Sequence, residues 1–246
     1  MSLRILAASL ALAASVPAET HWETAQFKDG SEIDYGFSDL DYKSHHKLQI
    51  AIGGWFSPNP LFPVRVGWYE PGKFKLNGSL SNLDLSWFLF SSEIDDSARV
   101  QVNSEYVGNN TINVYTTDIP YLRGLEHGPH LAIDHQLVLG DDVFGGVSLG
   151  YAWTWTTYYE FFVKPGKKEK RHTKSKQKTL SIDLQGFYSE GEFHPAVRIL
   201  LDGFNSLPLT DRFGLSYMIG CGYSPSLVPN MNWYPLLGLG LQWGFM

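Results

Sequence analysis

The chain has 246 residues, of which 15% are aromatic and 24 are glycine, and its formal net charge is −6. The negative charge argues against nucleic acid as a partner. The single cysteine, Cys221, excludes an internal disulfide framework. After residue 18 no continuous apolar run reaches the roughly 20 residues of a transmembrane helix. The composition therefore favours a protein built from strands.

The N-terminus has the three parts of a secretory signal. Arg4 gives a positive start, Ile5–Ala14 is a short apolar run, and Val16-Pro17-Ala18 fits a small-residue cleavage site. The apolar run is too short for a membrane anchor, which needs about 20 residues. We predict a signal peptide at 1–18 that is removed on export.

After the predicted signal, the chain divides into a short lead-in and a long patterned region. Residues 19–44 are polar, and we expect a periplasmic segment or an irregular lead-in, although alternation at 33–37 leaves a first strand open. In the predicted domain at 45–246, large apolar residues alternate with small or polar ones, as in a strand with one apolar face. The runs with this pattern are 48–52, 64–68, 74–80, 83–89, 100–106, 112–116, 131–139, 143–155, 180–184, 197–201, 213–223 and 237–245.

The strand count depends on one change of alternation, at Ser81–Asn82. A slip of one residue moves every following side chain to the other face of a sheet. If Ser81–Asn82 is a turn between two strands, we count twelve strands. If it is a bulge inside one long strand, we count ten. Twelve is the preferred count.

The apolar face decides between a barrel in a membrane and a sheet in water. Charged residues fall on the opposite face, which suits a wet barrel interior or a solvated outer surface; those predicted to face a lumen are Arg99, Glu105, Asp134, Asp183, Arg198 and Arg212. Trp and Tyr gather near strand ends on the apolar face, as they do at a membrane interface. The predicted interface aromatics are Tyr151, Trp153, Trp155, Trp243 and Phe245. We therefore predict an all-β transmembrane antiparallel up-and-down barrel.

The export signal, the alternating runs and the aromatic end of the last strand resemble bacterial outer-membrane β-barrel proteins as a class. The resemblance implies location in the outer membrane of a Gram-negative bacterium, with contacts to outer-membrane lipid, including lipopolysaccharide. It also implies recognition by the outer-membrane assembly machinery, which reads a terminal aromatic residue. Phe245 resembles that residue, although Met246 follows it. The oligomeric state stays open.

Candidate catalytic residues are few. A hydrolase needs a nucleophile, a base and an orienting group close together. His130 and Asp134 share the polar face, but four residues along a strand separate them by roughly 13 Å, too far for a hydrogen bond. His194 is the other candidate base. We expect these residues to be polar lining rather than catalytic, and we expect no metal site and no cofactor.

The sequence favours a small channel or a structural envelope protein with a narrow polar lumen. A lipid-modifying outer-membrane enzyme, an acyl hydrolase or acyltransferase, is the first alternative, so enzymatic activity stays open. A secreted β-protein that binds an apolar ligand is the second. The segment 164–178, with seven lysines and one arginine, is expected to be a polar loop that could bind an anionic surface. Substitutions at the lumen positions Gly150 and Gln185 are expected to be mild.

Overall fold

The computed structural model describes residues 20–26, 32–38, 48–57, 59–60, 64–80, 82–107, 111–135, 145–164, 170–189, 191–207, 212–225 and 232–245. The predicted signal peptide lies outside the described residues. In the described part, all regular structure is β-strand. The strands are β1 (Thr20–Gln26), β2 (Glu32–Ser38), β3 (Leu48–Ser57), β4 (Asn59–Pro60), β5 (Val64–Glu70), β6 (Phe74–Gly78), β7 (Asn82–Trp87), β8 (Phe90–Val107), β9 (Thr111–His135), β10 (Gly145–Lys164), β11 (Lys170–Ser189), β12 (Glu192–Ser206), β13 (Phe213–Tyr223) and β14 (Trp233–Phe245). No helix of the described residues is long and apolar enough to cross a membrane.

Ten of the described strands close into an antiparallel barrel, in the order β10-β11-β12-β13-β14-β3-β5-β6-β7-β9 and back to β10. The last ring strand in the chain, β14, pairs with the first, β3, and this pairing is the seam of the barrel. It runs from Phe245 opposite Leu48 to Leu237 opposite Phe56. A closed ring leaves no unpaired strand edge in the barrel wall. The predicted fold class is confirmed.

The preferred count of twelve strands is wrong, because the barrel has ten among the described residues. The turn near Ser81–Asn82 was correctly expected: the Ser79 amide donates to the Asn82 carbonyl across 2.8 Å, and β6 and β7 pair as separate strands. The error lies further along the chain. The runs 112–116 and 131–139 were counted as two strands, yet 111–135 is the single strand β9.

Strand β8 also adds nothing to the ring. It follows β7 along the same edge of β9, because β7 pairs with residues 130–134 and β8 with residues 111–127. The beginning of β8 therefore continues the line of β7, and the rest of β8 leaves the barrel with the first half of β9.

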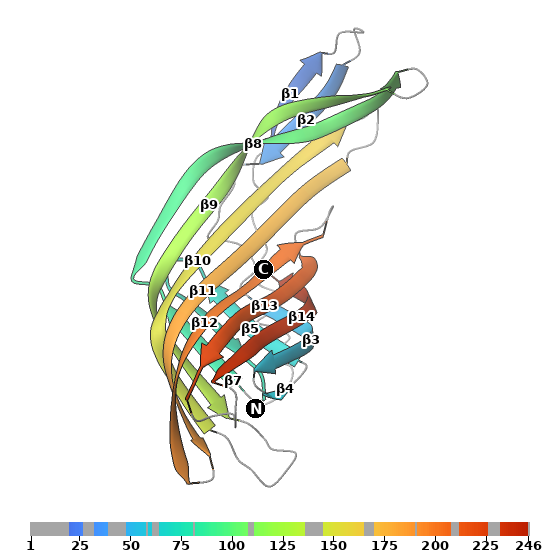
Figure 1. Ribbon diagram of the computed structural model, residues 1–246. Coiled ribbons are helices and arrows are strands. Elements are labelled where there is room, and N and C mark those ends of the chain that lie inside the picture. The colour runs from blue at the N-terminus through green and yellow to red at the C-terminus, as the bar shows by residue number, and fades with distance from the viewer. Residues whose placement is uncertain are drawn as a thin grey trace, which may run out of the picture.

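A sheet extension rises from one end of the barrel (Figure 1). It is built from β8, β9, β10 and β11, which have 18, 25, 20 and 20 residues. The hairpin β1–β2 pairs with the far end of β10, with Phe37 opposite Phe161. The expected irregular lead-in therefore contains two strands, and the alternation at 33–37 does mark one of them.

The expected polar loop at 164–178 is mostly strand. Strand β10 runs to Lys164 and β11 begins at Lys170, so the paired backbone of the extension includes most of these basic residues. Following the antiparallel order places this hairpin at the barrel end where β14 finishes. We call this end the extension end, and the opposite one, with the turn between β11 and β12, the turn end.

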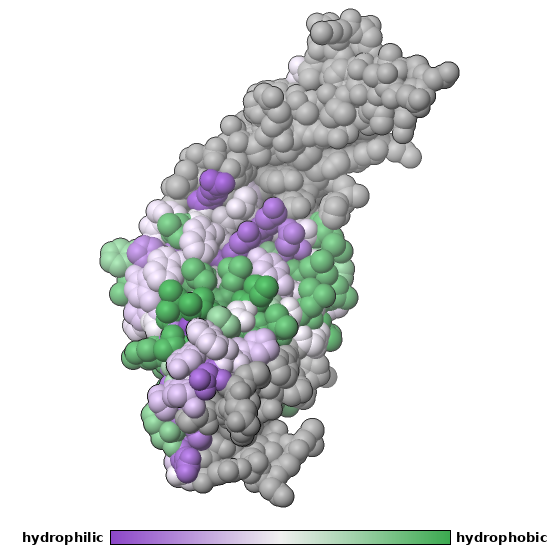
Figure 2. Space-filling view, in the orientation of Figure 1, coloured by the Kyte–Doolittle hydropathy of each residue, from purple (hydrophilic) through white to green (hydrophobic). Residues whose placement is uncertain are grey.

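The barrel wall is apolar outside and polar inside. Along β11, the outward side chains Ile182 and Leu184 are exposed, whereas the inward Ser181, Asp183 and Gln185 are buried. Figure 2 shows apolar side chains grouped over the barrel wall. Small apolar residues and a few large ones complete the interior; the buried apolar cluster is Ala51, Phe187, Ala196, Leu200, Met218, Tyr234 and Leu236.

Candidate functional site

The candidate site is the barrel interior, where inward side chains from the wall meet across the lumen. Its centre is Asp183 on β11, which is only 1% exposed. His130 Nδ1 of β9 lies 2.6 Å from Asp183 Oδ1. Arg198 of β12 places Nε 3.0 Å and Nη2 2.9 Å from Asp183 Oδ2. The Ser181 hydroxyl donates to the same oxygen across 3.1 Å. One buried carboxylate is thus held by three side chains.

A second carboxylate extends this cluster across the lumen. Asp84 Oδ1 of β7 lies 3.9 Å from His130 Nε2 and 3.9 Å from Arg198 Nη2. Its other oxygen lies 3.6 Å from Arg65 Nη2 of β5. Arg65 and Arg198 thus lie beside the carboxylates of Asp84 and Asp183, and the His130 imidazole lies between these two carboxylates. Charges of opposite sign at such distances offset part of the loss of their hydration.

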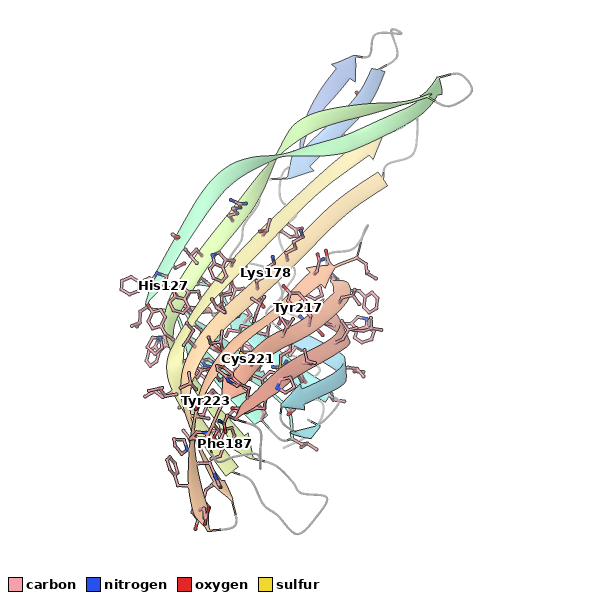
Figure 3. The ribbon with its side chains drawn as sticks, viewed as in Figure 1. His127, Lys178, Phe187, Tyr217, Cys221 and Tyr223 are labelled. Atoms are coloured by element: carbon pink, nitrogen blue, oxygen red, sulfur yellow. The ribbon has the colours of Figure 1, made fainter. Side chains whose placement is uncertain are left out.

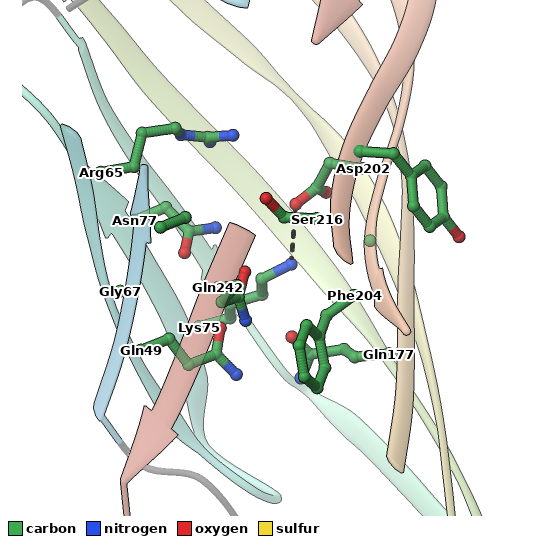
Figure 4. Close-up of a pocket in the computed structure, with 13 residues that line it drawn as sticks. Gln49, Arg65, Gly67, Lys75, Asn77, Gln177, Asp202, Phe204, Ser216 and Gln242 are labelled. Carbon is green, nitrogen blue, oxygen red and sulfur yellow. Dashed lines mark hydrogen bonds and ion pairs between the residues drawn. The ribbon is translucent and has the colours of Figure 1, made fainter. Parts of the chain in front are cut away.

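A separate ion pair lies closer to the extension end. Lys75 Nζ of β6 lies 3.0 Å from Asp202 Oδ2 of β12 and donates to Thr179 Oγ1 across 2.8 Å. Figure 4 shows this pair reaching across the lumen between strands on facing walls. The cavity around it has a volume of about 20 Å³, which is room for about one water molecule.

Hydrogen bonds fill the interior above and below these charges. Toward the extension end, the Tyr69 hydroxyl donates to Glu126 Oε2 across 2.7 Å, and the Gly72 amide donates to Glu126 Oε1. Toward the turn end, Gln185 donates to Ser148 and accepts from Tyr234, each across 2.8 Å. The interior is therefore occupied by bonded side chains along much of its length.

The structure brings three predicted residues into this site: His130, Asp183 and Arg198. His194 is also buried, on β12 next to Phe187 of β11 in the ladder. Asp134 pairs through its backbone with Gly146, and its side chain lies outside the described ones. His130 and Asp134 are four residues apart along β9.

Three predicted lumen residues do not line the barrel interior. Arg99 and Glu105 belong to β8 and pair with Asp118 and Asn113 in the sheet extension, beyond the end of the β9–β10 ladder. Arg212 is exposed at the start of β13. Alternation correctly separates two faces of a strand, but it does not tell whether that strand lies in the ring or extends beyond it.

Four of the five predicted interface aromatics lie on the outward face. Trp155 is 40% exposed and Trp243 is 37% exposed. Tyr151 and Trp153 are half-buried and contact each other, with ring centroids 4.9 Å apart. The side chain of Phe245 lies outside the described ones.

Further aromatic side chains, not predicted from the sequence, are exposed toward the turn end: Tyr188, Phe193, Tyr223 and Trp233. In Figure 3, Phe187 and Tyr223 lie toward this end, and His127 and Lys178 lie toward the other. Aromatic residues therefore flank the aliphatic band at both ends, as in a barrel with two interfacial girdles.

The contacts in the structure argue against mild substitutions at Gly150 and Gln185. A Cβ atom on Gly150 would lie 2.0 Å from the Ile182 carbonyl oxygen and 2.4 Å from Asp183 Oδ1. Gln185 bonds both Ser148 and Tyr234, which a shorter amide side chain would not reach together. Several other interior residues were not singled out from the sequence, notably Lys75, Asp84, Glu126 and Tyr234. Alternation alone could have placed the first two inward, but not paired them.

The geometry around His130 suits a structural role. Its Nδ1 is held by a carboxylate, as in a hydrolase, but its Nε2 faces Asp84 rather than a hydroxyl. A catalytic base would need its Nε2 against a nucleophile. The imidazole, both carboxylates and Arg198 lie on inward faces of the barrel wall, among the other bonded side chains of the interior.

No family model matches the chain, and no curated protein matches it. Among solved structures, the chain is similar to OmpT (in-vitro folded), an outer membrane protein of Vibrio cholerae in its trimer form. The identity is 10%, the match covers 95% of this chain and 67% of that one, and the TM-score is 0.21. The fold is established by the strand pairing itself: a closed antiparallel barrel with an apolar exterior, the architecture of the outer-membrane β-barrel class.

Proposed function

We propose that this protein is an integral barrel of the outer membrane whose lumen is closed by its own side chains, a structural envelope protein rather than an open channel. The observation that carries the proposal is the bonded interior. Ion pairs and hydrogen bonds join facing walls, and the cavity at the Lys75–Asp202 pair holds about 20 Å³. A solute the size of a sugar would have to break several of these pairs.

The exterior supports a position in the membrane. Leu149 and Leu184, which face each other in the β10–β11 ladder, are 64% and 69% exposed. In water these side chains would leave a broad apolar surface uncovered, which soluble monomers avoid. On β13 the outward apolar face extends over Phe213–Tyr223, or 11 residues, and a tilted strand needs about 9–11 to cross a bilayer.

Cys221 is a native reporter for this position, because it is exposed on the outward face of β13. We expect a water-soluble maleimide to react slowly with Cys221 in the protein in lipid nanodiscs and rapidly after unfolding. The control is Lys73→Cys in a Cys221→Ser background, since the Lys73 side chain is 70% exposed in a turn. Equal reaction rates at the two positions would contradict insertion and favour the secreted β-protein.

Conductance in planar bilayers tests the closed lumen. We expect no steady conductance from the wild-type protein and intermittent ion passage from the variant Lys75→Ala/Asp202→Ala, which removes an interior pair. The matched control, Glu70→Ala/Lys73→Ala, removes an ion pair of 3.6 Å from a turn and should leave the bilayer sealed. Stable open steps from the wild type would favour the small channel that the sequence also allowed.

A further inference from the structure

The barrel wall is not equally high on all sides. Strands β5, β6 and β7 have seven, five and six residues, whereas β13 and β14 have 11 and 13. A strand of an outer-membrane barrel needs about 9–11 residues to cross the bilayer. Over residues 64–80 and 82–87, the side of the ring built from β5, β6 and β7 is too short to cross it. We call this side the low wall, and the side built from β10 to β14 the high wall.

Exposed tryptophans give the depth of both walls. Trp68 of β5, Trp87 of β7 and Trp243 of β14 face outward near the extension end and are 40%, 63% and 37% exposed. Outward tryptophan gathers at the membrane interface, so these three side chains mark one boundary of the hydrocarbon. On β14, Trp233 is 61% exposed and marks the other boundary. Residues 233–243 rise about 25 Å along the barrel axis at a tilt of about 40°, which is the height of the apolar band of such barrels.

The low wall ends about halfway between these two boundaries. From Trp87, β7 runs toward the turn end only as far as Asn82, and from Trp68, β5 runs only as far as Val64. Each of these stretches rises about 10–13 Å on the same scale. The Ser79 amide donates to the Asn82 carbonyl in the turn between β6 and β7. In a bilayer of even thickness, this turn would lie in the middle of the hydrocarbon.

A turn is not stable at that depth in contact with lipid. Hydrocarbon offers no hydrogen-bond partner to the backbone groups that a turn leaves unbonded, so lipid-exposed turns do not occur there. The end of the β6–β7 hairpin does lie on the surface, because Leu80 is 57% exposed and Leu83, the first outward residue of β7, is 42% exposed. Water or lipid headgroups must therefore reach the end of this hairpin.

We propose that the low wall thins the bilayer beside it, so that water and phospholipid headgroups reach the turn between β6 and β7. A hydrophobic stretch that is shorter than the hydrocarbon is thick is accommodated by local thinning of the bilayer. This inference rests on the proposed membrane insertion, and it holds whichever leaflet the turn end faces. Beside the high wall the bilayer keeps its full thickness, so the lipid around the barrel is thin on one side only.

Cysteine reactivity tests the thinning. Leu80→Cys reports on the end of the low wall and Ile219→Cys on the high wall, each in the Cys221→Ser background. Ile219 is a matched position, because it is 54% exposed on the outward face of β13. Each variant is inserted into phosphatidylcholine nanodiscs, and heat-modifiable gel migration confirms that it is folded. The reagent is a maleimide attached to polyethylene glycol, which is too large to pass through the closed lumen.

We expect Leu80→Cys to react at least about tenfold faster than Ile219→Cys, because the reactive thiolate forms in water and not in hydrocarbon. Slow reaction at both positions would show that hydrocarbon covers the turn, which would overturn the thinning and leave the membrane barrel intact. Fast reaction at both positions would contradict insertion and overturn the proposed function as well. A rate at Leu80→Cys that is below the rate at Ile219→Cys would also overturn the thinning.

Discussion

The central carboxylate gives the sharpest test of the interior. In Asp183→Leu, Arg198 keeps its charge at 4% exposure and loses the anion at 2.9 Å. Asp84 stays in place as a counter-charge at 3.9 Å. Leaving a buried charge without its partner costs about 3–5 kcal/mol, and we expect the lower part of this range because Asp84 stays in place.

The double variant Asp183→Leu/Arg198→Met removes both charges together. Replacing a buried ion pair by apolar residues of similar volume is often neutral or stabilising, so we expect it to cost no more than about 1–2 kcal/mol. The double variant should therefore be more stable than Asp183→Leu alone. Urea titrations of the refolded barrel in phosphatidylcholine vesicles, followed by tryptophan fluorescence and heat-modifiable gel migration, measure the free energies of unfolding of Asp183→Leu, of Arg198→Met and of the double variant. If the costs of the single changes simply add, Asp183 and Arg198 do not form the pair described here.

Three further predictions concern the wall, the seam and the chemistry. Leu149→Arg and Leu184→Arg should each lower the free energy of unfolding by about 2–4 kcal/mol, because both residues are expected near the bilayer midplane. Gly150→Ser should also destabilise the barrel, because a Cβ atom at this position meets the backbone. A serine variant as stable as the wild type in urea titrations would contradict this contact. Deleting 237–246 removes the partner of β3 and should prevent closure, so a folded, heat-modifiable membrane protein after this deletion would place the seam elsewhere. Neither the wild type nor His130→Ala should release fatty acid from phospholipid; release by the wild type that is lost in the variant would restore the enzyme hypothesis.

Alternation in the sequence was enough to predict the barrel wall. It identified the outward faces of β11, β13 and β14 and the inward positions of His130, Asp183 and Arg198. It works because the side-chain period of a strand is two whatever its neighbours are. The same rule could not show where a strand leaves the ring, because the ladder of β9 continues without a break from the barrel into the extension. That continuity explains both the excess strand count and the misplacement of Arg99 and Glu105.

The contacts of the interior could not be predicted, because they depend on which strands face each other across the lumen. Lys75 and Asp202 are 127 residues apart in the chain, and they meet only because β6 and β12 stand on facing walls. Gly150 illustrates the same limit at short range. The sequence shows a small residue on the polar face, whereas the structure shows the Asp183 carboxylate and the Ile182 carbonyl where a Cβ atom of this residue would stand.

Charged pairs inside a membrane barrel are a costly way to fill space, so their arrangement needs a reason. If the inward side chains were apolar, they could face lipid as readily as the lumen, and the two faces of each strand would be interchangeable. His130, Asp183 and Arg198 are buried and Asp84 is half-buried, so a one-residue slip of β11 would turn Asp183 into the hydrocarbon, where a charge costs several kcal/mol. We therefore expect the ion network to specify the register of the wall. In the proposed function, a lumen closed by these pairs gains that specificity at the expense of a path for solutes.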